Sequence, residues 1–158
     1  MSDQKMVFIG GAGNMAGAVI GGMVASGYPA DNIVATGRNE DKLKAFCQRT
    51  GVSGSTDNLA AIADADVIVL SVKPQVMKEM CESIAGVVSA RKPLVITLAA
   101  GIPLAAYQRW LGAGVPIVRA MPNTPALVGT GVTGLYAGDG VTDEHKSVAT
   151  QMADAVGI

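Results

Sequence analysis

A glycine-rich turn near the amino terminus constrains this chain more than any other feature. The run Gly11-Ala12-Gly13-Asn14-Met15-Ala16 follows the short apolar segment Lys5–Gly10 and opens Asn14–Ser26, where apolar residues recur at helical spacing. A G-x-G-x-x-A pattern between a strand and a helix is typical of a dinucleotide-binding βαβ unit. Its small residues allow a tight bend, a close approach of backbone N–H groups to a pyrophosphate, and close helix–sheet packing. The alternative is a glycine turn selected for packing alone.

The same segment has a second interpretation as a membrane helix or a signal peptide. Met6–Gly27 contains 22 residues without a charge, and Gly13, Gly17 and Gly21 recur at intervals of four. Such a stretch could span a bilayer with a small-residue packing face. Paired glycines at Gly10-Gly11 would weaken a continuous helix, however. We therefore favour a strand, a turn and a helix.

Composition and charge exclude several classes of protein. The chain has 12 Lys+Arg against 13 Asp+Glu, which leaves none of the basic excess that nucleic-acid binding requires. An apolar content of 49% excludes a disordered chain. Cys47, Cys81 and a single histidine provide neither a disulfide framework nor metal-ligand spacing, so no metal site is expected. A cytoplasmic protein without nucleic-acid or membrane partners is the expectation.

Strand and helix patterns alternate along the whole chain. The predicted strands are Lys5–Gly10, Asn32–Thr36, a short one near Val52, Asp66–Val72, Leu94–Ala99, Val115–Arg119 and Val132–Tyr136. The predicted helices are Asn14–Ser26, Glu40–Thr50, Asn58–Ala63, Pro74–Val88, Pro103–Leu111 and Asp143–Ala155. This alternation predicts an α/β protein with a Rossmann-type, doubly wound, mostly parallel sheet, formed by residues 1–158 as one domain. Because Gly157-Ile158 resembles a helix cap and the start of a strand, we expect the domain to be part of a longer protein.

The end of the second predicted strand indicates which dinucleotide is bound. An acidic residue at this place would bind the ribose 2′-hydroxyl of NAD. Here Gly37-Arg38 occupies it, and the next acid is Glu40. A guanidinium matches the geometry of a phosphate, so Arg38 favours NADP, with NADPH preferred over NADH. The alternative is a solvated surface arginine.

Three further loops follow predicted strands, where open α/β sheets bind ligands. Ser71-Val72-Lys73-Pro74 could line the cofactor crevice, and Lys73 is either catalytic or simply solvated. Ala99-Ala100-Gly101 is small enough to lie against a nicotinamide ring, or is only a turn. The segment Met121–Pro125 is predicted as a rigid turn in which Asn123 and Thr124 bind substrate or stabilise the turn.

Together these motifs resemble pyrroline-5-carboxylate reductase. The matching residues are Phe8-Ile9-Gly10, Gly13-Asn14-Met15-Ala16, Asn58, Val72-Lys73-Pro74-Gln75, Ala99-Ala100-Gly101-Ile102 and Arg119 to Ala126. The resemblance implies a 6-phosphogluconate-dehydrogenase-like N-terminal domain and the reduction of 1-pyrroline-5-carboxylate to L-proline with NAD(P)H in proline biosynthesis. It also implies a homo-oligomer. By match to the family, the cofactor-binding residues are Gly11, Ala12, Gly13, Asn14, Met15, Gly37, Arg38, Asn58, Ser71, Val72, Lys73, Pro74, Ala99, Ala100 and Gly101. The substrate side is formed by Met121, Asn123 and Thr124, and no catalytic residue is assigned.

The chain departs from the family pattern in two ways. An additional residue in the turn leaves open whether Gly10 or Gly11 makes the bend. The family also continues into a helical C-terminal domain that forms the dimer and completes the active site, and this chain contains none of it, so we expect it to be inactive alone. The alternatives are another imine or hydroxy-acid reductase of the same superfamily, or a non-catalytic dinucleotide-binding module.

Overall fold

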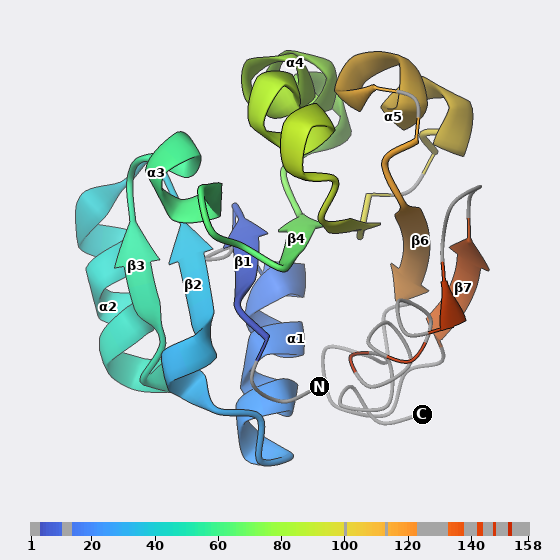
Figure 1. Cartoon of the computed structure of the whole chain (residues 1–158). Helices are drawn as coiled ribbons and strands as arrows, with labels where there is room; N and C mark the ends of the chain where they lie inside the picture. The colour runs from blue at the N-terminus through green and yellow to red at the C-terminus, as the bar shows by residue number, and fades with distance from the viewer. Residues whose placement is uncertain are drawn as a thin grey trace.

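A seven-stranded sheet forms the centre of the molecule (Figure 1). The computed structural model describes residues 4–10, 14–99, 101–112, 114–122, 133–137, 142, 143, 147 and 152. The strands lie in the order β3-β2-β1-β4-β5-β6-β7. Their bounds are β1 (Met6–Ile9), β2 (Ile33–Thr36), β3 (Ser53–Ser55), β4 (Val67–Leu70), β5 (Leu94–Thr97), β6 (Ile117–Pro122) and β7 (Thr133–Ala137). Neighbours from β3 to β6 pair in parallel and β7 pairs antiparallel with β6, which confirms the predicted mostly parallel sheet.

Helices cover both faces of this sheet. The helices α1 (Asn14–Ala25) and α2 (Glu40–Thr50) pack on one face, and a short 3-10 helix, η1 (Ala30–Asn32), precedes β2. The other face carries α3 (Asn58–Ile62), α4 (Pro74–Arg91) and α5 (Leu104–Leu111). Figure 1 shows α4 and α5 beside each other at the top of the view, away from α1 and α2. The chain is therefore doubly wound, as the alternation of patterns predicts.

Alternate residues of β1 supply the two cores. Met6 and Phe8 join the cluster under α1 and α2, whereas Val7 and Ile9 join the cluster under α3, α4 and α5. All four side chains are buried because a central parallel strand is covered on both faces. This explains why the strand pattern is continuously apolar rather than alternating.

Local capping determines where several helices begin and end. Asn39 accepts a hydrogen bond from the backbone N–H of Lys42 at 3.0 Å, and α2 ends at Gly51 with φ +84°. Pro74 occupies the first position of α4, which extends three residues beyond the predicted end at Val88. Arg91 is therefore still helical, and Lys92 ends α4 in the left-handed region with φ +51°.

The uncharged segment Met6–Gly27 does not form one helix. It is divided between β1 and α1, and Gly10 turns the chain away from the end of β1. The described part of the chain contains no helix both long and apolar enough to span a bilayer. The predicted strand and helix are confirmed, and Gly11, Ala12 and Gly13 between them lie outside the described residues.

The turn predicted for Met121–Pro125 is wrong at its first two residues. Met121 and Pro122 belong to β6, where they pair with Gly134 and Thr133 of β7. Antiparallel pairing with β7 extends β6 beyond Arg119, and proline at the last position of a strand has a φ compatible with extended backbone. Of the predicted helix Asp143–Ala155, only Asp143, Ser147 and Met152 are described, and each is helical.

Candidate dinucleotide-binding site

The strand order brings the carboxyl ends of six parallel strands to one edge of the sheet. β1 lies between β2 and β4, so the chain winds first to one side of β1 and then to the other. Open α/β sheets bind ligands in the crevice at such a reversal of strand order, outside the carboxyl ends of the strands. The described residues that directly follow β1, β2, β4 and β5 lie at this edge. They include most of the predicted cofactor residues.

Gly10 makes the bend that leaves β1. Its φ is +79°, a conformation that residues with a Cβ rarely adopt. A Cβ placed on Gly10 would also lie 3.0 Å from Val72 Cγ1 and 3.3 Å from the backbone nitrogen of Val72. Gly10 is thus required both by backbone conformation and by the close approach of the loop after β4. Gly11, Ala12 and Gly13 lie outside the described residues.

Ser71 connects the end of β4 to the end of β1. Its backbone N–H and its hydroxyl both donate to the carbonyl oxygen of Ile9, at 3.0 Å and 2.6 Å. On the other side of β1, the N–H of Gly10 donates to the buried hydroxyl of Thr36 at 3.4 Å. The hydroxyl of Thr36 in β2 therefore binds Gly10, and the hydroxyl of Ser71 after β4 binds Ile9, so both neighbours of β1 fix the residues that precede Gly11.

The loop after β2 presents Arg38 to solvent. The N–H of Gly37 donates to the carbonyl oxygen of Ser55 at 3.3 Å, which ties this loop to the end of β3. Asn58 is half-buried and begins α3, as predicted, after the N-cap residue Asp57. Arg38 is exposed, and no carboxylate among the described residues forms an ion pair with it. Its guanidinium is therefore available to an anionic ligand at the edge of the crevice.

The loop after β4 approaches the crevice mainly through its backbone. Val72 is half-buried against Gly10, whereas Lys73 and Pro74 are exposed. Lys73 is the N-cap of α4 but its side chain makes no capping hydrogen bond. An exposed lysine at a helix start matches the solvated interpretation better than the catalytic one.

The loop after β5 is held by a buried pair of hydroxyl groups. Thr97 ends β5, and its Oγ1 lies 2.7 Å from the phenolic oxygen of Tyr107 in α5. The same Oγ1 accepts a hydrogen bond from the N–H of Ala99 at 3.3 Å. Gly101 follows in the left-handed region with φ +83°. Ala100 lies outside the described residues.

Of the three predicted substrate-side residues, the described residues include Met121. Asn123 and Thr124 lie outside the described residues. Met121 is in β6, which is separated from β4 by β5, and its side chain is not described.

Asn14 and Met15 are the first two residues of α1. Their backbone positions agree with the predicted helix start.

The charges around the crevice suit a dinucleotide. The first turns of α1 and α4 contain no acidic residue, whereas the first turn of α2 contains Glu40 and Asp41. The free N–H groups at a helix N-terminus attract phosphate, and an acid there would oppose it. The glycine at position 10, which leaves no room for a side chain, and the acid-free start of α1 together fit a pyrophosphate at the turn. In the described part of the chain, no cluster of three or more side chains could hold a metal ion.

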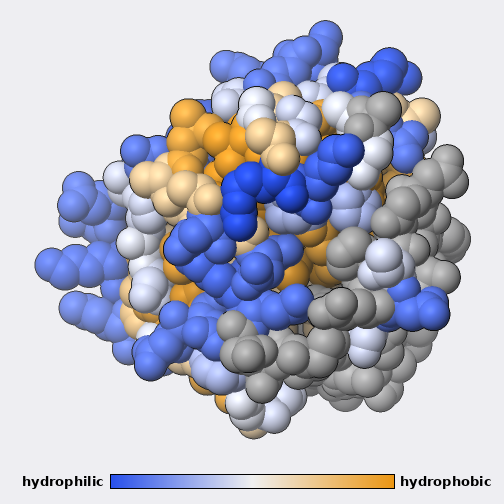
Figure 2. All heavy atoms as spheres, in the orientation of Figure 1, coloured by the Kyte–Doolittle hydropathy of each residue, from blue (hydrophilic) through white to orange (hydrophobic). Residues whose placement is uncertain are grey.

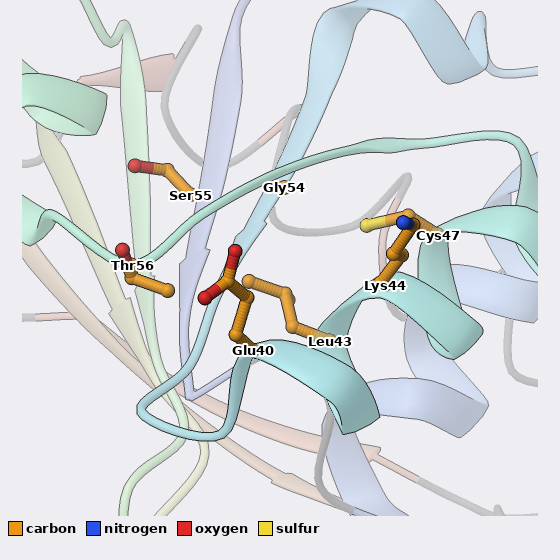
Figure 3. A pocket seen from close by; sticks show the side chains of 7 residues that line it. All are labelled: Glu40, Leu43, Lys44, Cys47, Gly54, Ser55 and Thr56. Carbon is orange, nitrogen blue, oxygen red and sulfur yellow. The ribbon is translucent and has the colours of Figure 1, made fainter.

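A separate pocket of about 510 Å³ lies at the far edge of the sheet. It is formed by Glu40, Leu43, Lys44 and Cys47 of α2 with Gly54 and Ser55 of β3 and the following Thr56 (Figure 3). Figure 3 shows the Glu40 carboxylate directed towards Thr56 across the opening. None of the predicted cofactor residues lines this pocket. Its lining contains one acidic and one basic side chain, Glu40 and Lys44.

The outer surface of α2 is mostly hydrophilic. Figure 2 shows hydrophilic side chains extending from the left edge, where Figure 1 places α2. Among the described residues, the exposed large hydrophobic side chain is Leu59 of α3, with 48% of its surface accessible. Such an isolated side chain is ordinary for a protein surface.

Thr36, Thr97 and Tyr107 were not predicted as site residues. Thr36 and Thr97 are the buried polar residues of the described core, with 1% and 0% of their surfaces exposed. Each is the last residue of an otherwise apolar parallel strand. That position is a usable signal, because a hydroxyl ending such a strand can bind the loops of the ligand edge. Tyr107 packs against Trp110, with ring centroids 5.8 Å apart.

Comparison with known proteins now identifies the family. A model of the family described as NADP oxidoreductase, coenzyme F420-dependent, matches residues 5–101, which is more than half of the chain. The chain belongs to this family. The match covers the strands and loops from β1 to Gly101 that form the crevice.

This member of the NADP oxidoreductase family is similar over its whole length to pyrroline-5-carboxylate reductases. It is 45% identical to the enzyme of that name from Pseudomonas aeruginosa, over 100% of this chain and 57% of that relative. A solved pyrroline-5-carboxylate reductase from Coxiella burnetii is 42% identical, with a TM-score of 0.95 over 99% of this chain and 57% of that one. The predicted resemblance is confirmed. The chain spans a little over half the length of the relatives it matches.

A more distant structure shares the fold. A pyrroline carboxylate reductase from Plasmodium falciparum, solved with NADP bound, has a TM-score of 0.86 at 24% identity and covers 100% of this chain and 57% of its own. The predicted Rossmann-type class is therefore confirmed both by the topology of the sheet and by these structures.

Proposed function

We propose that this chain is the NADP-binding part of a reductase that converts 1-pyrroline-5-carboxylate to L-proline. The observation that carries the proposal is the 45% sequence identity, over the whole chain, to a protein named pyrroline-5-carboxylate reductase. The positions that match the family's cofactor motifs and that the structure describes lie in the loops at one edge of the sheet. This supports a dinucleotide lying across β2, β1, β4 and β5.

In this proposal the nicotinamide supplies a hydride to the carbon of the C=N bond. A protonated imine is already electrophilic, so the protein mainly has to hold donor and acceptor in the correct geometry. The glycine turn after β1 and the start of α1 bind the pyrophosphate, the loop after β2 binds the adenosine half, and Ala99 to Gly101 lie against the nicotinamide. Met121, Asn123 and Thr124 are proposed for the substrate side.

We further propose a preference for NADPH, determined by Arg38. The guanidinium is exposed at the end of β2 and is followed in sequence by the cap of α2 rather than by a carboxylate that could bind a 2′-hydroxyl. A charge-assisted contact with the 2′-phosphate would strengthen NADPH binding by roughly tenfold to a hundredfold over NADH.

The test compares NADPH and NADH binding to the chain and to the Arg38→Ala variant. We expect Arg38→Ala to weaken NADPH binding by about tenfold or more and to leave NADH binding nearly unchanged. Arg49→Ala is the matched control, because Arg49 lies at the other end of α2, where its guanidinium stacks on Phe46 at 5.2 Å. Equal losses for both dinucleotides in Arg38→Ala would refute the assignment of Arg38.

The substrate is tested on the polypeptide that carries this chain. NADPH oxidation is followed with 1-pyrroline-5-carboxylate and, in parallel, with other cyclic imines and with oxo acids. Preferential turnover of 1-pyrroline-5-carboxylate supports the proposal, and preferential turnover of another substrate contradicts it.

We also propose a second, helical domain and assembly as a homo-oligomer. We propose a cytoplasmic location as well, and the free thiols of Cys47 and Cys81 support this location.

A further inference from the structure

A buried hydrogen bond joins β5 to α5 behind the loop that we place against the nicotinamide. Thr97 Oγ1 and the hydroxyl of Tyr107 are 2.7 Å apart, and both side chains are fully buried. The two residues are ten positions apart in sequence, so this contact closes the segment between them into a loop. Ala99, Ala100 and Gly101 lie within that loop.

The pair acts on this loop through a direct bond to its backbone. The N–H of Ala99 donates to Thr97 Oγ1 at 3.3 Å, directly after the last ladder bond, in which the N–H of Leu98 donates to the carbonyl oxygen of Leu70. Gly101 follows with a φ of +83°, a conformation that residues with a side chain rarely adopt. A Cβ added at Gly101 would have no atom within 4 Å. There is therefore open space beside Gly101, and Thr97 holds the start of the loop at Ala99.

We propose that Tyr107 is a positioning residue for the nicotinamide half of the cofactor. It holds the Thr97 hydroxyl, which in turn fixes Ala99 and the loop that follows. The inference rests on the proposed binding of NADP and extends it to a residue of α5 that does not line the crevice.

Two features of Tyr107 suit this role. It packs at 75° against the ring of Trp110, which restricts the ring from a second direction. Burial raises the pKa of its phenol, although the hydrogen bond with Thr97 opposes this, so the hydroxyl stays protonated at neutral pH. A buried phenol 2.7 Å from Thr97 Oγ1 restricts the position of that oxygen.

The experiment separates the two halves of the cofactor. Dissociation constants of the 158-residue chain are measured for NADPH and for adenosine 2′,5′-bisphosphate, which contains the adenosine half only. For Tyr107→Phe we expect NADPH to bind about three- to tenfold more weakly and the bisphosphate to bind within about twofold of the unmodified chain. The fluorescence of bound NADPH should shift towards that of free NADPH, because the nicotinamide is held less firmly.

Tyr28→Phe is the matched control. The hydroxyl of Tyr28 donates to the carbonyl oxygen of Gln4 at 2.6 Å, before the start of β1 and therefore at the opposite edge of the sheet. Tyr28→Phe also removes a single phenolic hydroxyl. The free energy of unfolding should therefore fall, whereas NADPH affinity should stay unchanged. A Tyr107→Phe variant that behaves like Tyr28→Phe overturns the inference.

A second pair of variants decides the question if Tyr107→Phe does not fold. Thr97→Ser keeps the hydroxyl and should bind NADPH normally, whereas Thr97→Val keeps the shape and should show the selective loss. Equal weakening of both ligands, or no weakening of either, overturns the inference and leaves NADP binding intact. If the unmodified chain binds neither ligand, both the inference and the proposed function fail.

Discussion

Ser71 donates two hydrogen bonds to one atom, the carbonyl oxygen of Ile9. The backbone N–H lies at 3.0 Å and the hydroxyl at 2.6 Å. The first bond continues the parallel pairing of β4 with β1, so any residue could make it. The second requires a hydroxyl side chain, and it secures the last residue of β1 directly before the bend at Gly10.

Replacing Ser71 by alanine removes only the second of these bonds. The Ile9 carbonyl keeps its backbone partner, so we expect the free energy of unfolding to fall by about 1 kcal/mol. Dinucleotide binding should weaken by roughly two- to tenfold, because the turn is held less firmly. Chemical denaturation and NADPH titration measure the two effects.

Ser83→Ala provides the control for Ser71→Ala. The hydroxyl of Ser83 also donates to a backbone carbonyl, that of Met80, at the same distance of 2.6 Å, but on the exposed surface of α4. Its removal should leave NADPH affinity unchanged. Identical affinities for Ser71→Ala and the unmodified chain would show that the hydroxyl does not position the turn.

Gly10→Ala should damage both stability and cofactor binding. A side chain at φ +79° costs about 1–2 kcal/mol in backbone strain, and its Cβ would stand 3.0 Å from Val72 Cγ1. We expect a lower thermal midpoint and loss of measurable NADPH affinity.

The control is Gly86→Ala on the exposed surface of α4, where no atom lies within 4 Å of the new Cβ. That change should stabilise the chain by up to about 1 kcal/mol. Unchanged NADPH affinity in Gly10→Ala would show that Gly10 is not the bend glycine of the phosphate turn.

The buried thiol of Cys81 predicts a loss of stability at alkaline pH. Burial raises its pKa to about 12, with a further contribution from the carboxylate of Glu82. In the unfolded chain the thiol ionises near its ordinary value, whereas the folded protein keeps it neutral. Its stabilising contribution is therefore complete below about pH 9 and is lost as the pH rises towards 12.

Denaturation at a series of alkaline pH values measures this effect. The Cys81→Ala variant should lose stability less steeply than the unmodified chain between about pH 9 and pH 12. Cys47→Ala is the comparison, because Cys47 is only partly buried and should contribute less. Parallel curves for Cys81→Ala and the unmodified chain would contradict the prediction.

The sequence alone determined the order and type of most elements. Continuous apolar runs such as Val67–Leu70 report burial on both faces, and caps such as Asn39 and Gly51 mark helix ends through bonds to near neighbours. These signals are local, because each depends on residues within one or two turns of the chain. The glycine pattern after β1 likewise predicted the ligand edge, since it combines a strand end, a bend and a helix start.

Other properties were decided only by the tertiary structure. Whether Gly10 forms a close bend depended on Val72, 62 residues later, and the strand state of Met121 depended on pairing with Gly134. The bond between Thr97 and Tyr107 required α5 to fold back over the end of β5. Each of these contacts joins elements whose relative placement follows from the order of strands in the sheet. Periodicity along a chain reports which residues are buried, but it does not report which buried residues meet.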